Sequence, residues 1–482
     1  MPLEIRSDQR SRGRRVASAC PRPPRGSDDS AAAPPLPSVQ WFAAVRRAAL
    51  RWFARHGRDL PWRRSNDAYA VLVSELMLQQ TTVATVAPRW QRFLAMFPTV
   101  EHLARADESE VLRAWEGLGY YRRAKQLHAA AQRIVADHAG NVPDDPATLA
   151  ELPGLGRYSA SAVLCFARGR SLPIVEANTR RLWARLLGFR AEANSPEADR
   201  MFWAAAERIV RRSRSPRQIN LALMDLGALV CRPRQPQCDR CPLVAHCAAW
   251  AQGLQKELPR KRTPVVLQPR HEAAVVIHRG SKVLLVRYGE TGQWSGLWDF
   301  PRVLLTDHCD PPTAETVGKQ VDELLDCLLG ERTDDCRQSD GDRRSDRPAR
   351  RIVVERHLAR WNHRVTRFQI TLECFTAQWI ADERAERSVA DSLNERAAAE
   401  DAALYAGTHS GRDERLSLGH PCAMAWVERE ALADYPLPST ARRLARLYFS
   451  AERREIPGKS NESSPIAAAK RATASDRRQR GS

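Results

Sequence analysis

The chain has 482 residues, 43% of them hydrophobic, and its 76 Lys and Arg residues against 57 Asp and Glu residues give a formal net charge of +19. This length predicts two or three domains, and the hydrophobic content excludes a chain that is disordered throughout. No apolar run approaches the roughly 18 residues of a membrane span, and no apolar signal core follows the Arg-rich start. The positive excess favours a polyanionic partner, either nucleic acid or an anionic membrane surface.

The two ends of the chain, residues 1–38 and 449–482, are rich in Ala, Pro, Ser and Arg and contain few large apolar side chains. Such segments bury too little apolar surface to offset the entropy of ordering, which predicts disordered tails, the C-terminal one basic. A solvated tail is the simpler interpretation, and a dedicated binding arm is the alternative. Two internal stretches near 306–350 and 381–418 look similar and are predicted to be polar surface insertions.

The spacing of apolar residues changes once along the rest of the chain. In the first half, apolar residues recur every three or four positions, which predicts helices. Further on, the β-branched runs 274–277 and 283–286 flank a short turn, which predicts a β-hairpin. A basic, Pro-containing stretch separates the two regions. The sequence therefore predicts an all-α domain at 39–258, a linker at 259–269 and an α+β domain at 270–448.

Four of the eleven cysteines form the most specific motif, a C-x6-C-x2-C-x5-C run within 17 residues. Because the chain is long and carries no secretion signal, metal ligation is a better interpretation than a disulfide framework. Structural zinc usually uses two short knuckles separated by a longer span, whereas this loop closes four thiolates around one compact centre, as iron-sulfur clusters require. A [4Fe-4S] cluster is favoured, and zinc or free thiols are the alternatives. The predicted ligands are Cys231, Cys238, Cys241 and Cys247.

The segment 152–156, Leu-Pro-Gly-Leu-Gly, is a turn followed by small and apolar residues that predict a helix. Gly154 and Gly156 allow the backbone to turn tightly and to approach a ligand. The N-terminus of the following helix would then offer free N–H groups to a phosphate. An ordinary connection between two helices is the alternative interpretation.

Two carboxylates stand in unusual surroundings. Glu75 is the only ionisable residue in the apolar run 71–78, and Glu176 and Asn178 follow the apolar run 173–175. A poorly solvated carboxyl has a raised pKa, which suits a general acid that must hold a proton near neutral pH. For Glu75, a surface position on a helix with a wide apolar face is the alternative.

Five motifs follow one another along the chain: Leu60-Pro61-Trp62-Arg63, the run from Ser74 to Thr81, the run from Gly117 to Ala124, the hairpin at 152–156 and the four cysteines. Together they resemble the helix-hairpin-helix, iron-sulfur DNA glycosylases, and within them the MutY-type adenine DNA glycosylases. The resemblance extends from about Trp41 to His246. It implies an all-α helix-hairpin-helix domain with a [4Fe-4S] loop at 231–247. The implied activity is base-excision repair, by hydrolysis of the N-glycosidic bond of adenine mispaired with 8-oxoguanine or guanine.

The resemblance also assigns roles to residues. Glu75 would protonate the departing adenine and then help to activate water, and Glu176 would stabilise the oxocarbenium-like sugar. Supporting groups around the two carboxylates would be Asn178, Tyr158 and Arg63. The implied DNA contacts are Gln80 and Tyr120, which would fill or wedge the base stack when the adenine flips out, and the hairpin glycines Gly154 and Gly156.

Two positions are informative departures. The family usually has Asp-Gly-Asn where this chain has Glu176-Ala177-Asn178, so the carboxylate is one methylene longer, a displacement of about 1 Å that can cost about 100-fold in rate. At position 158, endonuclease III-type relatives carry a Lys that forms a Schiff base and cuts the strand. Tyr158 cannot form one, which predicts a monofunctional glycosylase.

Residues 270–448 resemble, more weakly, the Nudix-like domain with which MutY proteins read 8-oxoguanine, and their best stretch is 293–301. No R-E-x-x-E-E cluster for Mg²⁺ is present at 305–335, so recognition without hydrolysis is implied. A lesion-reading loop is predicted at 363–368, where Val-Thr-Arg replaces the Phe-Ser-His that the family often has. The predicted lesion contacts are His363, Thr366 and Arg367, and a turn or core role is the alternative for His363.

The implied partner is double-stranded DNA that carries A opposite 8-oxoguanine or A opposite G, bound by a monomer without membrane contact. We expect a bacterial cytoplasmic, DNA-associated protein, since the Arg-rich start contains too many acids for an organelle presequence. Two other functions stay open. An endonuclease III-like glycosylase with lyase activity is disfavoured by Tyr158. A catalytically inactive mismatch-binding protein is suggested by Glu176 and by the altered loop.

Overall fold

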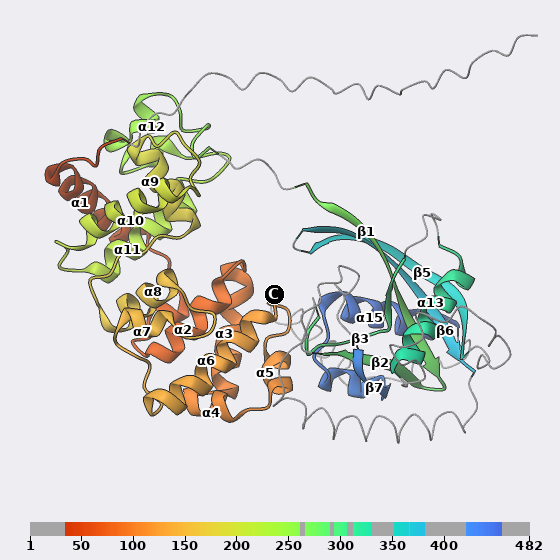
Figure 1. Cartoon of the computed structure of the whole chain (residues 1–482). Coiled ribbons are helices and arrows are strands. Elements are labelled where there is room, and N and C mark those ends of the chain that lie inside the picture. The colour runs from red at the N-terminus through yellow and green to blue at the C-terminus, as the bar shows by residue number, and fades with distance from the viewer. Residues whose placement is uncertain are drawn as a thin grey trace, which may run out of the picture.

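A computed structural model describes residues 34–260, 266–289, 294–305, 312–328, 351–365, 367–380 and 421–455 of the chain. It has a helical part, formed by residues 34–260, and a part built around a β-sheet, formed by the remainder (Figure 1). The predicted insertion at 381–418 and most of the two predicted tails lie outside the described residues. In the described ranges, no helix is both long enough and apolar enough to cross a membrane.

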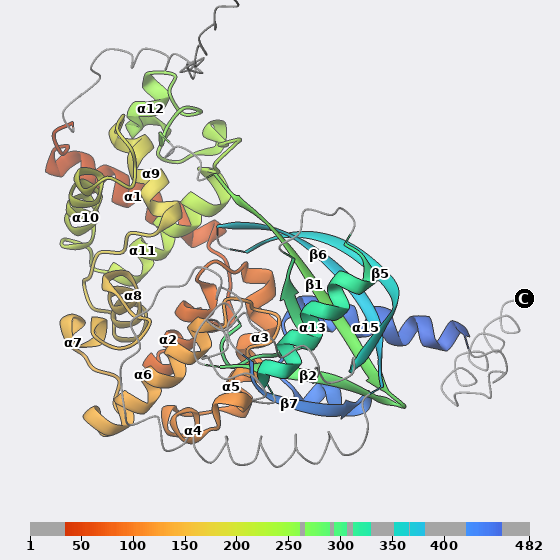
Figure 2. The same ribbon diagram turned by 45° about the vertical axis from the view of Figure 1, so that its right-hand side comes forward.

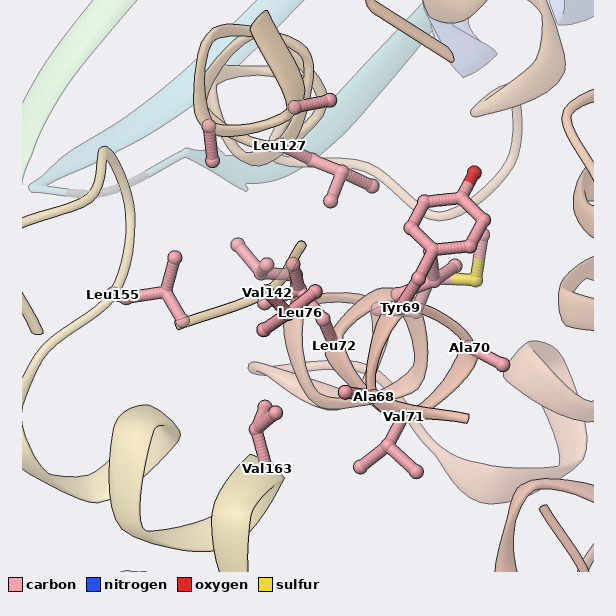
Figure 3. Close-up of a cluster of buried hydrophobic side chains, with 14 of the residues drawn as sticks. Ala68, Tyr69, Ala70, Val71, Leu72, Leu76, Leu127, Val142, Leu155 and Val163 are labelled. Atoms are coloured by element: carbon pink, nitrogen blue, oxygen red, sulfur yellow. The ribbon is translucent and has the colours of Figure 1, made fainter. Parts of the chain in front are cut away.

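The helical part has two halves, each with its own hydrophobic core. In the first half α2 is buried from Ala68 to Met77, as expected for a helix that is hydrophobic on all sides. Figure 3 shows Leu72 and Leu76 of α2 among Leu127, Val142 and Val163 from surrounding elements. The first half contains α2 (Ala68–Leu78), α3 (Val83–Met96), α4 (Val100–Arg105), α5 (Glu108–Ala114), α6 (Arg122–His138), α7 (Pro146–Ala150) and α8 (Arg157–Arg168).

The second half joins the first helix of the chain to the helices that follow α8. Its core packs Trp183 of α9 and Phe202 of α10 against Phe42 of α1. The segment that carries the four cysteines lies at the edge of this core, because Cys231, Cys241 and Cys247 pack against it. The helices are α1 (Val39–His56), α9 (Ala177–Leu187), α10 (Pro196–Val210), α11 (Pro216–Asp225) and α12 (Ala248–Ala251), with short helical turns at Leu226–Val230, Cys238–Arg240 and Val244–His246. A further short turn, Pro61–Arg63, belongs to the first half, since its Trp62 is buried in that core.

The β-sheet has the order β3-β2-β1-β6-β5, with β4 paired to β1 and β7 paired to β2. Strand β1 runs parallel to β6, and the other pairs are antiparallel. The predicted hairpin is confirmed, since Arg279 pairs with Lys282 where β1 turns into β2. The strands are β1 (Gln268–Arg279), β2 (Lys282–Tyr288), β3 (Trp298–Asp299), β4 (Arg302–Leu304), β5 (Ile352–Val365), β6 (Phe368–Trp379) and β7 (Pro421–Glu428).

Each face of the sheet is covered by one helix, α13 (Ala314–Leu328) or α15 (Ser439–Glu455) (Figure 2). Side chains alternate between the faces, so Val275 packs with α13 and Val276 packs with α15. An α+β fold is thus confirmed for the C-terminal part.

The structure differs from the sequence prediction at three places. Helix α13 lies inside the stretch 306–350 that was predicted to be a polar insertion, and it buries Val317, Val321 and Leu325 at a spacing of four. Helix α15 continues to Glu455, beyond the predicted start of the tail at residue 449. Strand β1 begins at Gln268, within the predicted linker. Composition averaged over a long window misses these short amphipathic elements.

The two parts contact each other at the segment between α5 and α6. Arg442 of α15 forms a bidentate ion pair with Glu116, with both N–O distances at 2.8 Å. The hydroxyl of Tyr121 donates a hydrogen bond of 3.2 Å to the carbonyl of Leu437. Leu297, next to β3, is buried in the core of the first helical half. Charge pairing and apolar burial together therefore join the sheet part to the helical part.

Candidate active site

Glu75 lies on α2 and is buried, with 3% of its surface exposed. The hydroxyl of Tyr158 on α8 donates a hydrogen bond of 2.8 Å to Oε2 of Glu75. Burial raises the pKa of Glu75 to about 7, and the negative charge of Glu176 acts in the same direction, while the Tyr158 hydrogen bond and the charge of Arg63 oppose it. A sizeable fraction of Glu75 therefore carries a proton at neutral pH.

Glu176 is the N-cap residue of α9, and its carboxylate accepts hydrogen bonds from the first turn of that helix. The backbone N–H groups of Asn178 and Thr179 donate over 2.7 Å and 3.0 Å, and Asn178 Nδ2 donates over 3.1 Å. In return, the Glu176 N–H donates to Thr179 Oγ1, which completes a capping box. Burial raises the pKa of Glu176, against these hydrogen bonds. The cap therefore fixes the orientation of the carboxylate.

Arg63 is held by Asp225, a residue for which the sequence reasoning predicted no role. Its two terminal nitrogens donate over 2.8 Å to the two carboxylate oxygens of Asp225, which is fully buried at the end of α11. The backbone and side chain of Arg58 bind the same carboxylate. Burial would raise the pKa of Asp225, but the two arginines outweigh burial and lower it. Asp225 is the only ionisable residue in the run 219–226, the same signal that singled out Glu75.

All five predicted catalytic residues line a single pocket of about 180 Å³. The pocket lies between the two helical halves, since α2 and α8 supply Glu75 and Tyr158 while the start of α9 supplies Glu176 and Asn178. Its walls combine a proton donor, an anionic group and apolar surface, which suits acid-catalysed bond cleavage with stabilisation of positive charge. The remaining lining residues are Arg58, Leu60, Trp62, Val71, Leu78, Thr81, Val83, Phe166, Arg217, Leu221, Met224 and Ala228.

The predicted hairpin connects α7 to α8, and its two glycines differ in their surroundings. Gly154 has φ of +77°, and a Cβ there would meet Gln126 Cβ at 2.7 Å, so the fold itself requires glycine. Gly156 is the N-cap residue of α8, and a Cβ there would meet nothing within 4 Å. The open position at Gly156 leaves the N-terminus of α8 accessible to a ligand.

Gln80 and Tyr120 lie outside the set of residues that line the pocket, but their neighbour Thr81 is within it. Gln80 follows α2, and Tyr120 precedes α6 with 51% of its surface exposed. Both residues adopt positive φ values, 56° and 48°. One exposed polar and one exposed aromatic side chain are thus carried by strained backbone, and Gln80 directly precedes the pocket residue Thr81.

The four predicted cysteine ligands line one cavity with apolar walls, and all four are free thiols. Neither a carboxylate nor an imidazole lines this cavity among the described residues. Those residues also contain no set of three metal-ligating side chains placed to hold a metal ion. The Nη1 atom of the buried Arg185 donates over 3.2 Å to Cys231 Sγ. Four soft thiol donors around one shared cavity fit a thiolate-ligated cluster.

A second arginine connects the cysteine loop with the pocket. Arg181 donates from Nε to the carbonyl oxygen of Cys231 over 2.7 Å and from Nη2 to Asn178 Oδ1 over 2.9 Å. The same Nη2 also donates over 2.7 Å to the carbonyl oxygen of Gly227. The position of Asn178 therefore depends on the backbone of the cysteine loop.

The predicted lesion-reading loop lies at the turn of the β5–β6 hairpin, because Val365 pairs with Phe368. None of its described residues lines the pocket. Arg367 is exposed, and its guanidinium lies 5.0 Å from the centre of the Phe368 ring. His363 is half-buried on β5, burial lowers its pKa, and its ring nitrogens have no hydrogen-bond partner among the described residues. Thr366 lies outside the described residues.

Residues 73–208 match the HhH-GPD superfamily of base excision DNA repair proteins. The adenine DNA glycosylase of Mycobacterium tuberculosis is 45% identical over 202 residues, which cover 42% of this chain and 66% of that protein. The adenine DNA glycosylase of Buchnera aphidicola is 31% identical over 253 residues, 52% of this chain and 73% of that protein. The human adenine DNA glycosylase is 32% identical over 319 residues, 55% of this chain and 58% of that protein. The match thus spans less than two thirds of the human relative.

Proposed function

This chain belongs to the adenine DNA glycosylase family, and we propose that it excises adenine from duplex DNA in which adenine is paired with 8-oxoguanine or with guanine. The observation that carries the proposal is the pair of buried carboxylates, Glu75 and Glu176, in one pocket, with Tyr158 hydrogen-bonded to Glu75. Such a pair supplies the proton donor and the stabilising anion that cleavage of an N-glycosidic bond requires.

In the proposed reaction, the adenine nucleotide first leaves the base stack and enters the pocket. Glu75, of which a sizeable fraction is protonated at neutral pH because of its burial, donates its proton to adenine at N7, so that the base departs as a neutral molecule. The sugar becomes an oxocarbenium-like cation, which the carboxylate of Glu176 stabilises. Glu75, now ionised, accepts a proton from the water that attacks the sugar.

The other polar residues of the pocket hold these two carboxylates. Tyr158 orients Glu75 through its hydroxyl, and Asn178 holds Glu176 at the start of α9. Arg63, fixed by Asp225, supplies a positive charge beside Glu75. None of the residues that line the pocket in the described part of the chain is a lysine, which supports a glycosylase without strand-cleaving lyase activity.

The proposed DNA contacts lie around the pocket. Gln80 and Tyr120 would occupy or wedge the base stack, and the N-terminus of α8 at Gly156 would face a phosphate. We also propose that Cys231, Cys238, Cys241 and Cys247 hold a [4Fe-4S] cluster. When bound, the cluster would keep the loop closed and so present its exposed arginines to the phosphate backbone.

For the C-terminal part we propose a Nudix-like domain that reads 8-oxoguanine without hydrolysing nucleotides. Its β5–β6 turn carries the exposed Arg367, as a loop that reaches into DNA would need. Replacing Thr366 and Arg367 together by alanine should lower the preference for A opposite 8-oxoguanine over A opposite G, because the loop would lose its polar contacts. The ratio of the two single-turnover rates measures this preference, and a ratio equal to that of the unaltered protein would refute the loop assignment.

The proposed function is tested by single-turnover excision on duplexes that carry A opposite 8-oxoguanine, A opposite G or A opposite T, with protein shown to contain iron and sulfide. We expect adenine release that is fastest opposite 8-oxoguanine, with strand cleavage only after alkali treatment. Borohydride should trap no covalent DNA adduct, and a trapped adduct would favour an endonuclease III-like lyase. Tight binding without release would mean that the chain is a catalytically inactive lesion binder.

A further inference from the structure

Gln80 and Tyr120 share an uncommon backbone conformation. Among the described residues, three that are not glycine have positive φ: these two and Ala139. Ala139 terminates α6, where the left-handed conformation is common, whereas Tyr120 precedes a helix. The left-handed conformation is energetically unfavourable for residues other than glycine. It persists only where surrounding contacts stabilise it.

One buried side chain, Arg123 on α6, contacts the backbone that leads into both residues, and it is 5% exposed. Its Nη1 atom donates hydrogen bonds of 2.9 Å to the carbonyl oxygens of Leu76 and Met77, and it also donates to the carbonyl oxygen of Gln79. These three carbonyls lie at the C-terminal end of α2, immediately before Gln80. One terminal nitrogen of Arg123 thus holds the backbone that leads into Gln80.

The other terminal nitrogen of Arg123 holds the second segment. Its Nη2 atom donates over 3.1 Å and 3.0 Å to the carbonyl oxygens of Leu118 and Gly119, immediately before Tyr120. It also donates over 3.0 Å to Thr81 Oγ1, which in turn donates over 3.2 Å to the carbonyl of Leu118. The guanidinium carbon lies 5.5 Å from the centre of the Tyr120 ring. The Arg123 guanidinium therefore forms hydrogen bonds with both segments that carry left-handed residues, the one before Gln80 and the one before Tyr120.

A planar guanidinium is suited to this task because its two terminal nitrogens point in fixed directions, whereas a lysine ammonium is a single point. Helix-terminal carbonyls carry partial negative charge and lack partners inside the helix, so a buried cation there forms strong hydrogen bonds. Burial costs a charged group its hydration and lowers the pKa of Arg123 to about 10, and the hydrogen bonds from its terminal nitrogens to six acceptors recover part of that cost. A guanidinium thus supplies separate donor atoms to the two segments, whereas an ammonium supplies all of its donors from one atom.

We propose that Arg123 is a positioning residue that couples Gln80 and Tyr120 into one rigid unit, so that both side chains enter the base stack together when adenine is extruded. The proposal deepens the proposed function and rests on it, because it assigns the means by which the two DNA-wedging residues are held in place. Loosening the unit would lower the population of the flipped-out state rather than the affinity for duplex DNA.

The test uses full-length protein with Arg123→Lys and Arg123→Met, with Arg133→Met as matched control. Arg133 lies on the same helix but is exposed and paired with Asp137. Fluorescence of 2-aminopurine placed opposite 8-oxoguanine reports unstacking, and single-turnover adenine release reports excision. We expect the two Arg123 variants to lose the fluorescence increase and to excise about 100-fold more slowly, with unchanged duplex affinity. Unaltered unstacking in both variants would overturn the proposal.

A double-mutant cycle separates coupling from a general structural role. If Arg123 acts through the wedging residues, Arg123→Lys should slow excision far less in a protein that already carries Gln80→Ala and Tyr120→Ala, and an equal loss in both backgrounds would contradict coupling. Should the Arg123 variants fail to fold, Thr81→Val removes the hydroxyl that bridges the two segments and should reduce unstacking, and full unstacking would count against the proposal. Absence of adenine release from the unaltered protein would refute the proposed function alone, since the unstacking signal is independent of excision.

Discussion

Glu75→Gln should lower the single-turnover rate of adenine release by about 100- to 10,000-fold, the range that general acid catalysis contributes, without loss of duplex binding. Glutamine has nearly the shape of glutamic acid and can still accept the Tyr158 hydrogen bond, so the pocket should keep its geometry. Its amide has no acidic proton to give to adenine. A variant that keeps turnover within tenfold of the unaltered protein would refute Glu75 as the general acid.

The pH dependence gives this prediction a second readout. Because the pKa of Glu75 is about 7, its acidic form is lost as pH rises through that value, and the excision rate should fall about tenfold for each further pH unit. Tyr158→Phe removes a hydrogen bond that favours the charged form, so the pKa of Glu75 should rise and the decline should move to higher pH. Glu176→Gln removes a neighbouring negative charge, which should move the decline to lower pH.

Tyr69→Phe is a matched control for Tyr158→Phe. Tyr69 is also buried and also donates a hydrogen bond, but to the backbone carbonyl of Phe97 and not into the pocket. Its replacement should leave the pH dependence unchanged. Equal displacement of the pH dependence in both variants would mean that the displacement reports general loosening of the fold and not the protonation of Glu75.

Short-range sequence patterns were sufficient to predict part of the candidate site and part of the fold. A lone acid in an apolar run predicted the burial of Glu75, and the change from helical to alternating periodicity predicted the all-α and α+β parts. A short turn between β-branched runs predicted the hairpin of β1 and β2. Each of these features depends on residues close together in sequence, where spacing has a direct structural meaning.

Contacts between residues far apart in the sequence could not be predicted from the spacing of residue types. Arg63 and Asp225 are 162 positions apart, and no local pattern selects that partner for either residue. Arg123 stands in a family motif, but its hydrogen bonds to α2 depend on how α6 packs against that helix. The parallel pairing of β1 with β6 is non-local for the same reason. Tertiary packing decides these contacts, and packing is a property of the whole chain.

Glu176 presents the second large expected effect, because the same carboxylate caps α9 and lines the pocket. Glu176→Gln should slow excision by about 100- to 1,000-fold, since the oxocarbenium-like sugar would lose its stabilising anion. Glu176→Asp should keep turnover, because aspartate retains the charge and is a preferred N-cap residue. We would measure single-turnover rates of both variants on A opposite 8-oxoguanine. Glu176→Gln reports the effect of losing the charge, and Glu176→Asp reports the effect of losing one methylene.

A capping control is needed, because glutamine also weakens the cap by about 1 kcal/mol, the typical cost of a lost N-cap. Ser195 caps α10 through a hydrogen bond of 3.1 Å from the Ala198 N–H and does not line the pocket. Ser195→Ala should therefore lower thermal stability to a similar extent while leaving the excision rate unchanged. If Glu176→Gln retains turnover, the assignment of Glu176 fails. If Ser195→Ala slows excision as much as Glu176→Gln does, the loss reports helix capping rather than charge stabilisation.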